Sequence, residues 1–367
     1  MGIFRKAATQ SAGPIDVSIT DRAPCEKSLS VRVKPEVLAP IRADVVKEFH
    51  KEAAVDGFRK GKVPLDVVER RFAQGIQEET LRRATRQVLQ QAAEAHHLRP
   101  VGPFELTKAD LVDGEGLRLE ATVEVEPSFP LGHYKGLALT RPSKEVDAQD
   151  LEQALTQLQE SLAQLTPTGQ GEAKERKVPA RDDEFAKDLG FENVEKLTRH
   201  VEAKLREQKR VAAAQALEAA LCEELLKRHQ FDVPAKMVAH QTERLTREFK
   251  TRLLLSGMAE AQVNQQAEQF TQQLRTNAER HVKLGFILDR IATQEQVNVT
   301  QDDVVKRLWQ LAQRWRKDPK EVRQIFDSQG LWPSVASAIR QEKTTALLMK
   351  AAKVEPAASL AAGHNAT

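Results

Sequence analysis

The chain has 367 residues, enough for two or three domains of ordinary size. Apolar residues make up 40% of it and charged residues 30%, with a formal net charge of +3. Because both signs of charge are well mixed, the composition excludes a uniformly basic nucleic-acid-binding protein, although it allows a local basic patch.

Three further features narrow the class of protein. The sequence has no apolar run close to the roughly 18 residues that span a bilayer, and no apolar stretch of a secretory signal at its start. Its two cysteines, Cys25 and Cys222, lie far apart and give no disulfide framework. It contains no Gly-rich phosphate loop, nucleophile motif or metal-spaced Cys and His cluster. We therefore expect a cytoplasmic protein that is not an enzyme and carries no cofactor or metal.

The first part of the chain shows the pattern of strands. Apolar and polar residues alternate near the N-terminus, as half-buried strands require. The apolar positions are Ile15, Val17 and Ile19, then Leu29, Val31 and Val33. The same alternation returns over residues 117–125, after a turn signal at Asp113 and Gly114. These segments predict strands that share one apolar face.

Two helices are predicted between these strands, each with an apolar residue at every third or fourth position. The first is expected to end at Gly57, because glycine often follows the last turn of a helix. The second is expected to begin at Pro64 and to run to about Leu98, since proline fits the first turn. Strands and helices together predict an α+β domain over residues 15–130, preceded by a flexible extension at residues 1–14.

The rest of the chain has a helical pattern. We expect a linker at residues 131–190 that contains one helix and is broken by "TPTGQGEAKERKVPARDDE", a run of Gly, Pro and charge. An elongated all-α domain with helical arms is predicted over residues 191–352, including a Gln-rich helix over residues 259–293 and a capping box that starts at Thr300. Residues 353–367 are expected to form a flexible tail.

Two groups of large apolar residues in the helical domain are interpreted differently. Trp309, Trp315, Phe326 and Trp332 are predicted to be core residues. The other group is predicted to be partly exposed, because the Gln-rich helix beside it cannot bury a leucine cluster well. Its members, which we expect to bind unfolded clients, are Phe249, Leu253, Leu254, Leu255, Met258 and Phe270.

The segment between the two N-terminal helices is the strongest functional candidate. It reads "DGFRKGKVP" and contains Gly57, Phe58, Arg59, Lys60, Gly61 and Lys62. The ordinary interpretation of such a segment is a solvated turn, and turn chemistry explains its glycines. It does not explain an aromatic ring beside three cations. These side chains suit contact with RNA or with an acidic protein surface.

The sequence "GFRKGKVP" resembles the ribosome-docking loop of the bacterial trigger factor family almost letter for letter. Three later segments resemble parts of that family's C-terminal domain, in the same order: "FENVEKLTRHVEAKLREQ", "FDVPAKMVAHQTERL" and "DPKEVRQIF". The resemblance extends over residues 15–352 and includes the order of strands, helices and loop in the first domain.

The resemblance implies an ATP-independent chaperone that docks at the exit tunnel of the large ribosomal subunit and shields nascent polypeptides. It implies that Phe58, Arg59 and Lys60 contact a ribosomal protein and nearby ribosomal RNA, while Gly57 and Gly61 let the loop bend. Unfolded nascent polypeptides are the implied clients, and no membrane partner is implied. Because the family often self-associates, the resemblance also allows a homodimer away from the ribosome.

One departure from the family concerns an enzyme activity. Its members usually carry an FKBP-like prolyl isomerase domain, and residues 166–184 occupy that place here. This stretch has neither the sheet nor the aromatic-lined pocket of an isomerase, so we expect no isomerase activity.

Two functions that do not involve ribosome docking are also compatible with the sequence. One is that of a helical protein that grips RNA directly through the loop. The other is that of a free-standing holdase, which would bind unfolded chains through its helical domain. Binding to naked RNA and suppression of client aggregation are the properties that distinguish them from a ribosome-docking chaperone.

Overall fold

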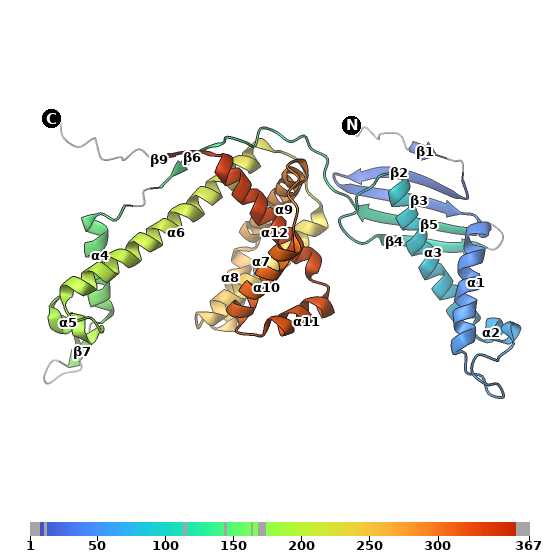
Figure 1. Cartoon of the computed structure of the whole chain (residues 1–367). Coiled ribbons are helices and arrows are strands. Elements are labelled where there is room, and N and C mark those ends of the chain that lie inside the picture. Colours follow the sequence, from blue (N-terminus) through green and yellow to red (C-terminus); the bar gives the residue numbers. More distant parts are fainter. Residues whose placement is uncertain are drawn as a thin grey trace. The chain divides into compact units, whose positions relative to one another are not determined.

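The computed structural model describes residues 8–10, 13–112, 116–142, 145–162, 164–167 and 174–356 (Figure 1). The chain forms two compact units, each made of two separate segments. The first unit contains residues 1–130 and 229–287, and the second contains residues 131–228 and 288–367. The turn predicted at Asp113 and Gly114 lies outside the described residues.

The first unit contains an antiparallel sheet of five strands in the order β1-β2-β3-β5-β4. The strands are β1 (Ala8–Gln10), β2 (Ile15–Ala23), β3 (Glu26–Val33), β4 (Glu105–Val112) and β5 (Gly116–Glu124). Val31 pairs with Val17 on one side and with Leu119 on the other, so apolar residues of three strands share a face. The predicted strands are confirmed, and β1 places a strand within the extension that was expected to be flexible.

Helices cover the apolar face of this sheet (Figure 1). They are α1 (Pro35–Glu52) and α3 (Ala73–Ala95), whereas α2 (Leu65–Arg71) packs against these two helices. Leu38 of α1 and Val88 of α3 are buried in one cluster with Leu29 and Leu119 of the strands. This shared core fixes the two long helices on the sheet.

Two helix boundaries differ from the prediction. The first helix ends at Glu52 rather than at Gly57, because Ala53 leaves the helical conformation and is buried. The second is interrupted at Phe72, whose ring packs against Phe49 with the ring centroids 6.1 Å apart. In both cases the packing of one side chain outweighs the helical preference of its neighbours.

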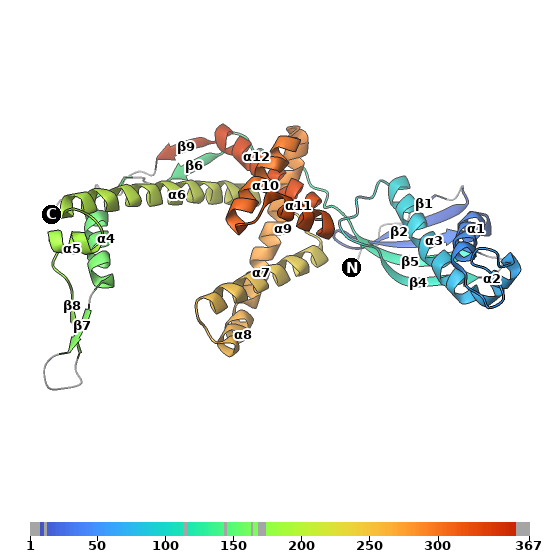
Figure 2. The same cartoon turned by 60° about the horizontal axis from the view of Figure 1, so that its bottom comes forward.

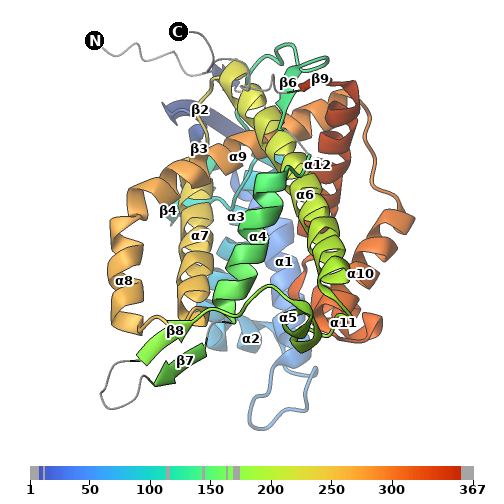
Figure 3. The same cartoon turned by 90° about the vertical axis from the view of Figure 1, so that its left-hand side faces the viewer.

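The remainder of the first unit consists of α7 (Ala235–Leu255), α8 (Glu260–Gln269) and the first part of α9 (Thr271–Gln294). α7 and α8 lie side by side (Figure 3). The single Gln-rich helix predicted over residues 259–293 is wrong, because the helix breaks at Phe270, whose ring packs against Phe249 of α7. The buried Glu124 accepts a hydrogen bond of 2.8 Å from the Lys236 N–H, which holds the start of α7 to β5.

The second unit is mostly helical. Its helices include α4 (Ala148–Ser161), α5 (Asp183–Asp188), α6 (Val194–Arg228), α10 (Gln301–Trp315), α11 (Pro319–Gln329) and α12 (Trp332–Ala351). Between α4 and α5, β7 (Gln164–Pro167) pairs antiparallel with β8 (Lys174–Lys177). β6 (Ala138–Arg141) pairs in parallel with β9 (Lys353–Pro356), so the first residues of the expected tail belong to a strand (Figure 2).

The start of α10 confirms the predicted capping box. The Thr300 hydroxyl accepts a hydrogen bond from the Asp303 N–H, and the Asp303 carboxylate accepts one from the Thr300 N–H. Lys343 of α12 also donates to this carboxylate at 2.7 Å. The Lys343 hydrogen bond, followed by those from Thr300, lowers the pKa of Asp303 to about 2.

The prediction that the tryptophans are core residues is wrong for two of them. Trp309 is 56% exposed and Trp315 is 44% exposed, whereas Trp332 is half-buried. Phe326 is buried as predicted and packs with Ala312 and Val322. Trp309 and Trp315 remain exposed because α11 and α12 cover only part of the apolar stripe of α10.

The α+β region followed by a mostly helical chain confirms the predicted fold class. Among the described residues, no helix has the length and apolar character that crossing a membrane would need. The same residues contain no group of three or more His, Cys, Asp or Glu side chains that could hold a metal ion.

Gly116 provides a test of the sheet. It has a φ of +94°, and a Cβ there would lie 1.9 Å from the Val33 carbonyl oxygen. We predict that Gly116→Ala lowers the free energy of unfolding by at least about 2 kcal/mol, because backbone strain and a clash with β3 add together. Gly102→Ala is the control, since a Cβ there meets no atom within 4 Å. Calorimetric unfolding of Gly116→Ala that matched the control and the wild type would contradict the prediction.

Candidate functional site

The candidate site is the loop between α1 and α2, which extends past the ends of both helices (Figure 1, Figure 3). Both ends of the loop are buried: Ala53 is 4% exposed and Val63 is 1% exposed. They belong to a loop-base core that consists of Val45, Val46, Ala53, Val63, Val68 and Ile76. A ring nitrogen of His50 lies 2.8 Å from the Val63 carbonyl oxygen. The loop therefore starts and ends at fixed points.

Two turns shape the loop between these points. The Phe58 N–H donates to the Val55 carbonyl at 3.0 Å, and the Lys62 N–H donates to the Arg59 carbonyl at 2.9 Å. Gly57 and Gly61 have φ angles of +89° and +74°, a left-handed conformation that glycine adopts at little cost. The glycines thus form the turns of the loop rather than ending a helix.

The side chains of the loop are available to a partner. The Phe58 ring is 46% exposed. Arg59, Lys60 and Lys62 are all exposed, and none of them forms an ion pair within the described part of the chain. The aromatic ring and the cations predicted from the sequence are therefore brought together on one projection, where they can meet another macromolecule.

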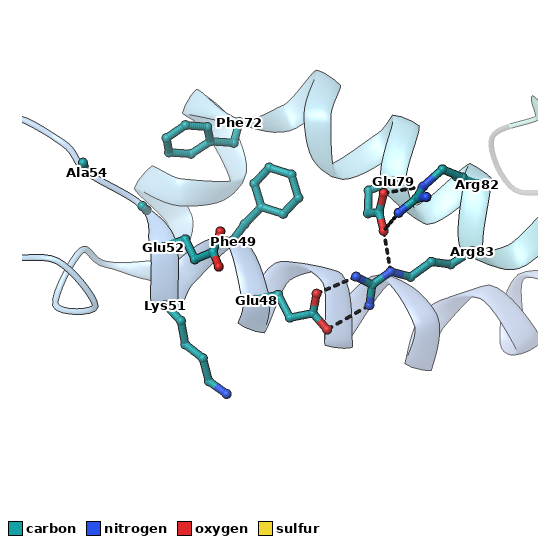
Figure 4. A pocket seen from close by; sticks show the side chains of 10 residues that line it. Glu48, Phe49, Lys51, Glu52, Ala54, Phe72, Glu79, Arg82 and Arg83 are labelled. Carbon is teal, nitrogen blue, oxygen red and sulfur yellow. Dashed lines mark hydrogen bonds and ion pairs between the residues drawn. The ribbon is translucent and has the colours of Figure 1, made fainter. Parts of the chain in front are cut away.

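A pocket of about 680 Å³ lies beside the start of the loop (Figure 4). Its apolar lining comes from Phe49 at the end of α1, Phe72 between α2 and α3, and Ala53 and Ala54 at the loop start. Charged residues line the rest of the pocket: Glu48, Lys51, Glu52, Glu79, Arg82 and Arg83. Because anions and cations are balanced in this lining, the pocket favours neither sign of ligand charge.

An ionic network beside this pocket ties α1 to α3 (Figure 4). Arg83 donates to the Glu48 carboxylate, with Nη1 and Oε1 2.9 Å apart, and its Nε donates to Glu79 at 2.6 Å. Arg82 donates two hydrogen bonds of 2.7 Å to the same Glu79 carboxylate. The hydrogen bonds from Arg82 and then Arg83 lower the pKa of Glu79 to about 2. The Arg83 hydrogen bond likewise lowers the pKa of Glu48.

Comparison with known proteins identifies the family of the chain. A sequence model of the bacterial trigger factor protein matches residues 15–158, and a model of the bacterial trigger factor C-terminus matches residues 193–350. The chain belongs to the trigger factor family. The trigger factor of Shouchella clausii (strain KSM-K16) is 23% identical over 414 residues, which cover 89% of this chain and 95% of that protein.

A second relative agrees with membership of the trigger factor family. The trigger factor of Geobacillus sp. (strain WCH70) is 24% identical over 418 residues, covering 90% of this chain and 97% of that protein. A solved structure from a study of substrate recognition by the trigger factor chaperone aligns with 91% of this chain and 99% of that chain. Its TM-score is 0.47 at 18% sequence identity.

The interval between the two matched ranges is too short for an FKBP-like isomerase domain. The two matched ranges leave only residues 159–192 between them, fewer than the roughly 50 of a small domain. The described residues of this interval form the end of α4, the β7–β8 hairpin and α5. The alignment with the Shouchella clausii relative is 414 residues long, against 367 in this chain, so part of that relative has no counterpart here.

The predicted client-binding residues lie around the turn between α7 and α8 and at the end of α8. Three of them are exposed: Leu254 by 48%, Leu255 by 84% and Phe270 by 42%. The other three, Phe249, Leu253 and Met258, are half-buried. The rings of Phe249 and Phe270 contact each other with centroids 5.6 Å apart, which joins the two helices. These six residues, the α7–α8 patch, thus combine anchored and exposed apolar side chains.

Sequence reasoning missed two features. The ionic network gave no local signal, because Glu48 and Arg83 are 35 positions apart. The exposed stripe of α10 did have a signal, since Val305 and Trp309 are four residues apart and share a helix face. That spacing is equally compatible with a buried core stripe. Only the packing of the neighbouring helices decides whether the stripe is buried or exposed.

The low pKa of Glu79 gives a prediction of pH dependence. Its ordinary value is 4.5, so the network stabilises the fold fully above that pH and is lost as pH falls toward 2. We expect Glu79→Gln to lower the free energy of unfolding by about 1 kcal/mol at pH 7, and this deficit to vanish near pH 2. Calorimetry of both proteins across this range measures the difference.

The matched control is Glu78→Gln on the same helix, where the carboxylate accepts a hydrogen bond only from the neighbouring Gln74 among the described residues. We expect this variant to behave like the wild type at every pH. A Glu79→Gln deficit that stays constant from pH 7 to pH 2 would contradict the assigned pKa.

Proposed function

We propose that this trigger factor family member is an ATP-independent cytoplasmic chaperone that docks at the exit tunnel of the large ribosomal subunit and shields nascent polypeptides. The observation that carries the proposal is the exposed Phe58 ring beside the unpaired Arg59 and Lys60, on a loop whose two ends are buried. Membership of the family supports the chaperone role.

The loop suits docking for two physical reasons. Its cations attract the phosphates of ribosomal RNA or an acidic patch of a ribosomal protein, an attraction that salt weakens. The Phe58 ring supplies apolar contact area at small conformational cost. Because the loop-base core already fixes both ends of the loop, little further ordering opposes binding.

Client binding is assigned to the α7–α8 patch. Its exposed Leu254, Leu255 and Phe270 offer apolar contacts to an unfolded chain without enclosing it. Each such contact is weak. Several contacts together retain a client, and each one can break without nucleotide hydrolysis, so the client can leave. This balance fits a chaperone that works without ATP.

The docking proposal is tested by replacing Phe58, Arg59 and Lys60 together with alanine. We expect co-sedimentation with ribosomes to fall at least about tenfold, because the anchor ring and two cations are removed. The matched control replaces Leu106, Lys108 and Arg22 with alanine. These three residues are exposed on the five-stranded sheet, away from the loop. It removes one apolar side chain and two cations and should co-sediment normally.

Three outcomes of this experiment separate the candidate functions. Unchanged co-sedimentation of the loop variant contradicts ribosome docking. Tight binding of the wild type to naked RNA of unrelated sequences, lost in the loop variant, favours a general RNA-binding protein instead. If neither protein co-sediments but both suppress client aggregation, the chain is a free-standing holdase.

The client-binding proposal is tested by Leu254→Ser, Leu255→Ser and Phe270→Ser in one protein. We expect suppression of aggregation of an unfolded client to weaken severalfold, with ribosome co-sedimentation unchanged. Leu162→Ser and Val211→Ser form the control, since both residues are exposed apolar side chains outside the patch. Equal activity of the patch variant and the wild type would show that clients bind elsewhere.

We expect no prolyl isomerase activity, because residues 159–192 leave no room for the domain that would carry it. A proline-limited refolding assay with a standard unfolded substrate measures this. Acceleration of the slow phase by the chain would contradict the expectation.

A further inference from the structure

A short stretch of α10 and α11 combines tryptophan with dense positive charge. It covers residues 304–320 and reads "VVKRLWQLAQRWRKDPK". The stretch contains six Lys or Arg residues and one acidic residue, Asp318, whereas the whole chain has a net charge of only +3. Aromatic residues interleaved with cations are typical of proteins that bind single-stranded nucleic acid.

Both tryptophans of this stretch are open to solvent. Trp309 is 56% exposed and Trp315 is 44% exposed. The Trp315 ring packs edge-on against the buried Phe326, with centroids 6.0 Å apart, so the core fixes one side of it. Neither indole N–H donates a hydrogen bond within the described part of the chain, whereas that of Trp332 donates to Asp327 at 2.7 Å. Two ring faces, about 9 Å apart along the helix axis, are therefore available for stacking.

Unneutralised cations lie beside these indoles. Four residues are exposed and have no side-chain partner among the residues that the structure describes: Lys306, Arg314, Arg316 and Lys320. Lys306 is one helical turn before Trp309, and two arginines flank Trp315 in the sequence. The one acidic residue of the stretch, Asp318, uses its carboxylate to accept a hydrogen bond of 2.7 Å from the Lys320 N–H at the start of α11. The indoles and these four cations form the α10–α11 surface.

The chemistry of the α10–α11 surface suits nucleic acid better than an acidic polypeptide. A base offers a flat π-face that stacks on an exposed indole, and every nucleotide brings its own phosphate to a cation. Gln313 lies four residues after Trp309, is exposed, and makes no side-chain hydrogen bond within the described ranges. Its amide can both donate to and accept from the edge of a base. Rings, cations and an amide thus match the three parts of a nucleotide that a protein contacts.

We propose that the α10–α11 surface binds single-stranded nucleic acid, with bases stacked on Trp309 and Trp315 and phosphates held by the four cations. This inference goes beyond the chaperone function proposed above, because it gives the second unit a ligand that is not a client polypeptide. Stacking and phosphate contacts carry little base identity, so we expect binding to tolerate sequence. The bases of a duplex are stacked on one another and are not available to the indoles.

The chain carries its own reporter for this proposal. Its three tryptophans, Trp309, Trp315 and Trp332, all lie on α10 to α12, so intrinsic tryptophan fluorescence reports on this surface. The measurement uses the full chain with Phe58, Arg59 and Lys60 replaced by alanine, which removes nucleic-acid binding by the docking loop. We expect a short uridine oligonucleotide to quench the fluorescence at low salt, and a duplex of uridine and adenosine oligonucleotides at the same concentration to quench it little.

Variants of one tryptophan test stacking. Anisotropy of a labelled uridine oligonucleotide measures affinity without relying on the tryptophans. Trp309→Leu should weaken binding about tenfold, because it removes the more exposed ring, whereas Trp309→Phe keeps a ring and should retain most of the affinity. Circular dichroism checks that both variants retain their helices.

A second set of variants tests the phosphate contacts. Arg314→Gln, Arg316→Gln and Lys320→Gln together should lower the slope of log affinity against log salt by about 2, because three cations no longer release counterions from a single strand. The matched control is Lys187→Gln, Lys204→Gln and Lys350→Gln, which removes the same charge at exposed positions elsewhere in the unit. It should leave the slope unchanged.

Several results would overturn the proposal. Absence of quenching at low salt, or equal quenching by the duplex, removes base stacking on the indoles. Equal loss of affinity in Trp309→Leu and Trp309→Phe does the same. Tighter binding of a peptide that carries apolar residues flanked by aspartates assigns the surface to polypeptide. Because all of these measurements are made with the docking loop replaced, they succeed or fail independently of ribosome co-sedimentation.

Discussion

The burial of two small apolar residues, Ala53 and Val63, is the constraint on which the candidate docking site depends. Because both pack under the loop, the stretch between them has to leave the domain and return within a short distance. The ring and the cations between Ala53 and Val63 are therefore exposed to solvent. The hydrogen bonds within the loop and the network of Arg83 with Glu48 and Glu79 then hold this projection on a firm base.

In the proposed function, charged side chains serve ribosome docking and exposed apolar side chains serve client binding. The loop presents one ring with cations and suits a fixed, highly charged partner. The α7–α8 patch presents several apolar side chains that are only partly covered, which suits partners of varied sequence. Both surfaces rest on ordered neighbours: the loop on its buried base core, and Phe270 on the half-buried Phe249. The exposed side chains of these surfaces are therefore held in place by packed neighbours.

A short connection occupies residues 159–192, between the two ranges that the family models match. Described residues there form two paired strands and a short helix, and Arg181 donates hydrogen bonds of 2.7 and 2.8 Å to Glu152 of α4. Phe185 and Leu197 are buried together nearby. The connection thus has a small core of its own, and the segments that carry the proposed docking and client surfaces lie outside it.

The sequence by itself determined the fold class, the strands at 15–33 and 117–125, and the capping box at Thr300, because alternation and capping are local patterns. It also located the loop, since a ring among cations between two glycines is visible without coordinates. Tertiary structure alone decided the helix ends at Glu52 and Phe72, the break at Phe270, and the exposure of Trp309 and Trp315. Those outcomes depend on which side chains, distant in the sequence, pack at each position. An apolar stripe has the same sequence pattern whether a neighbouring helix covers it or leaves it exposed to solvent.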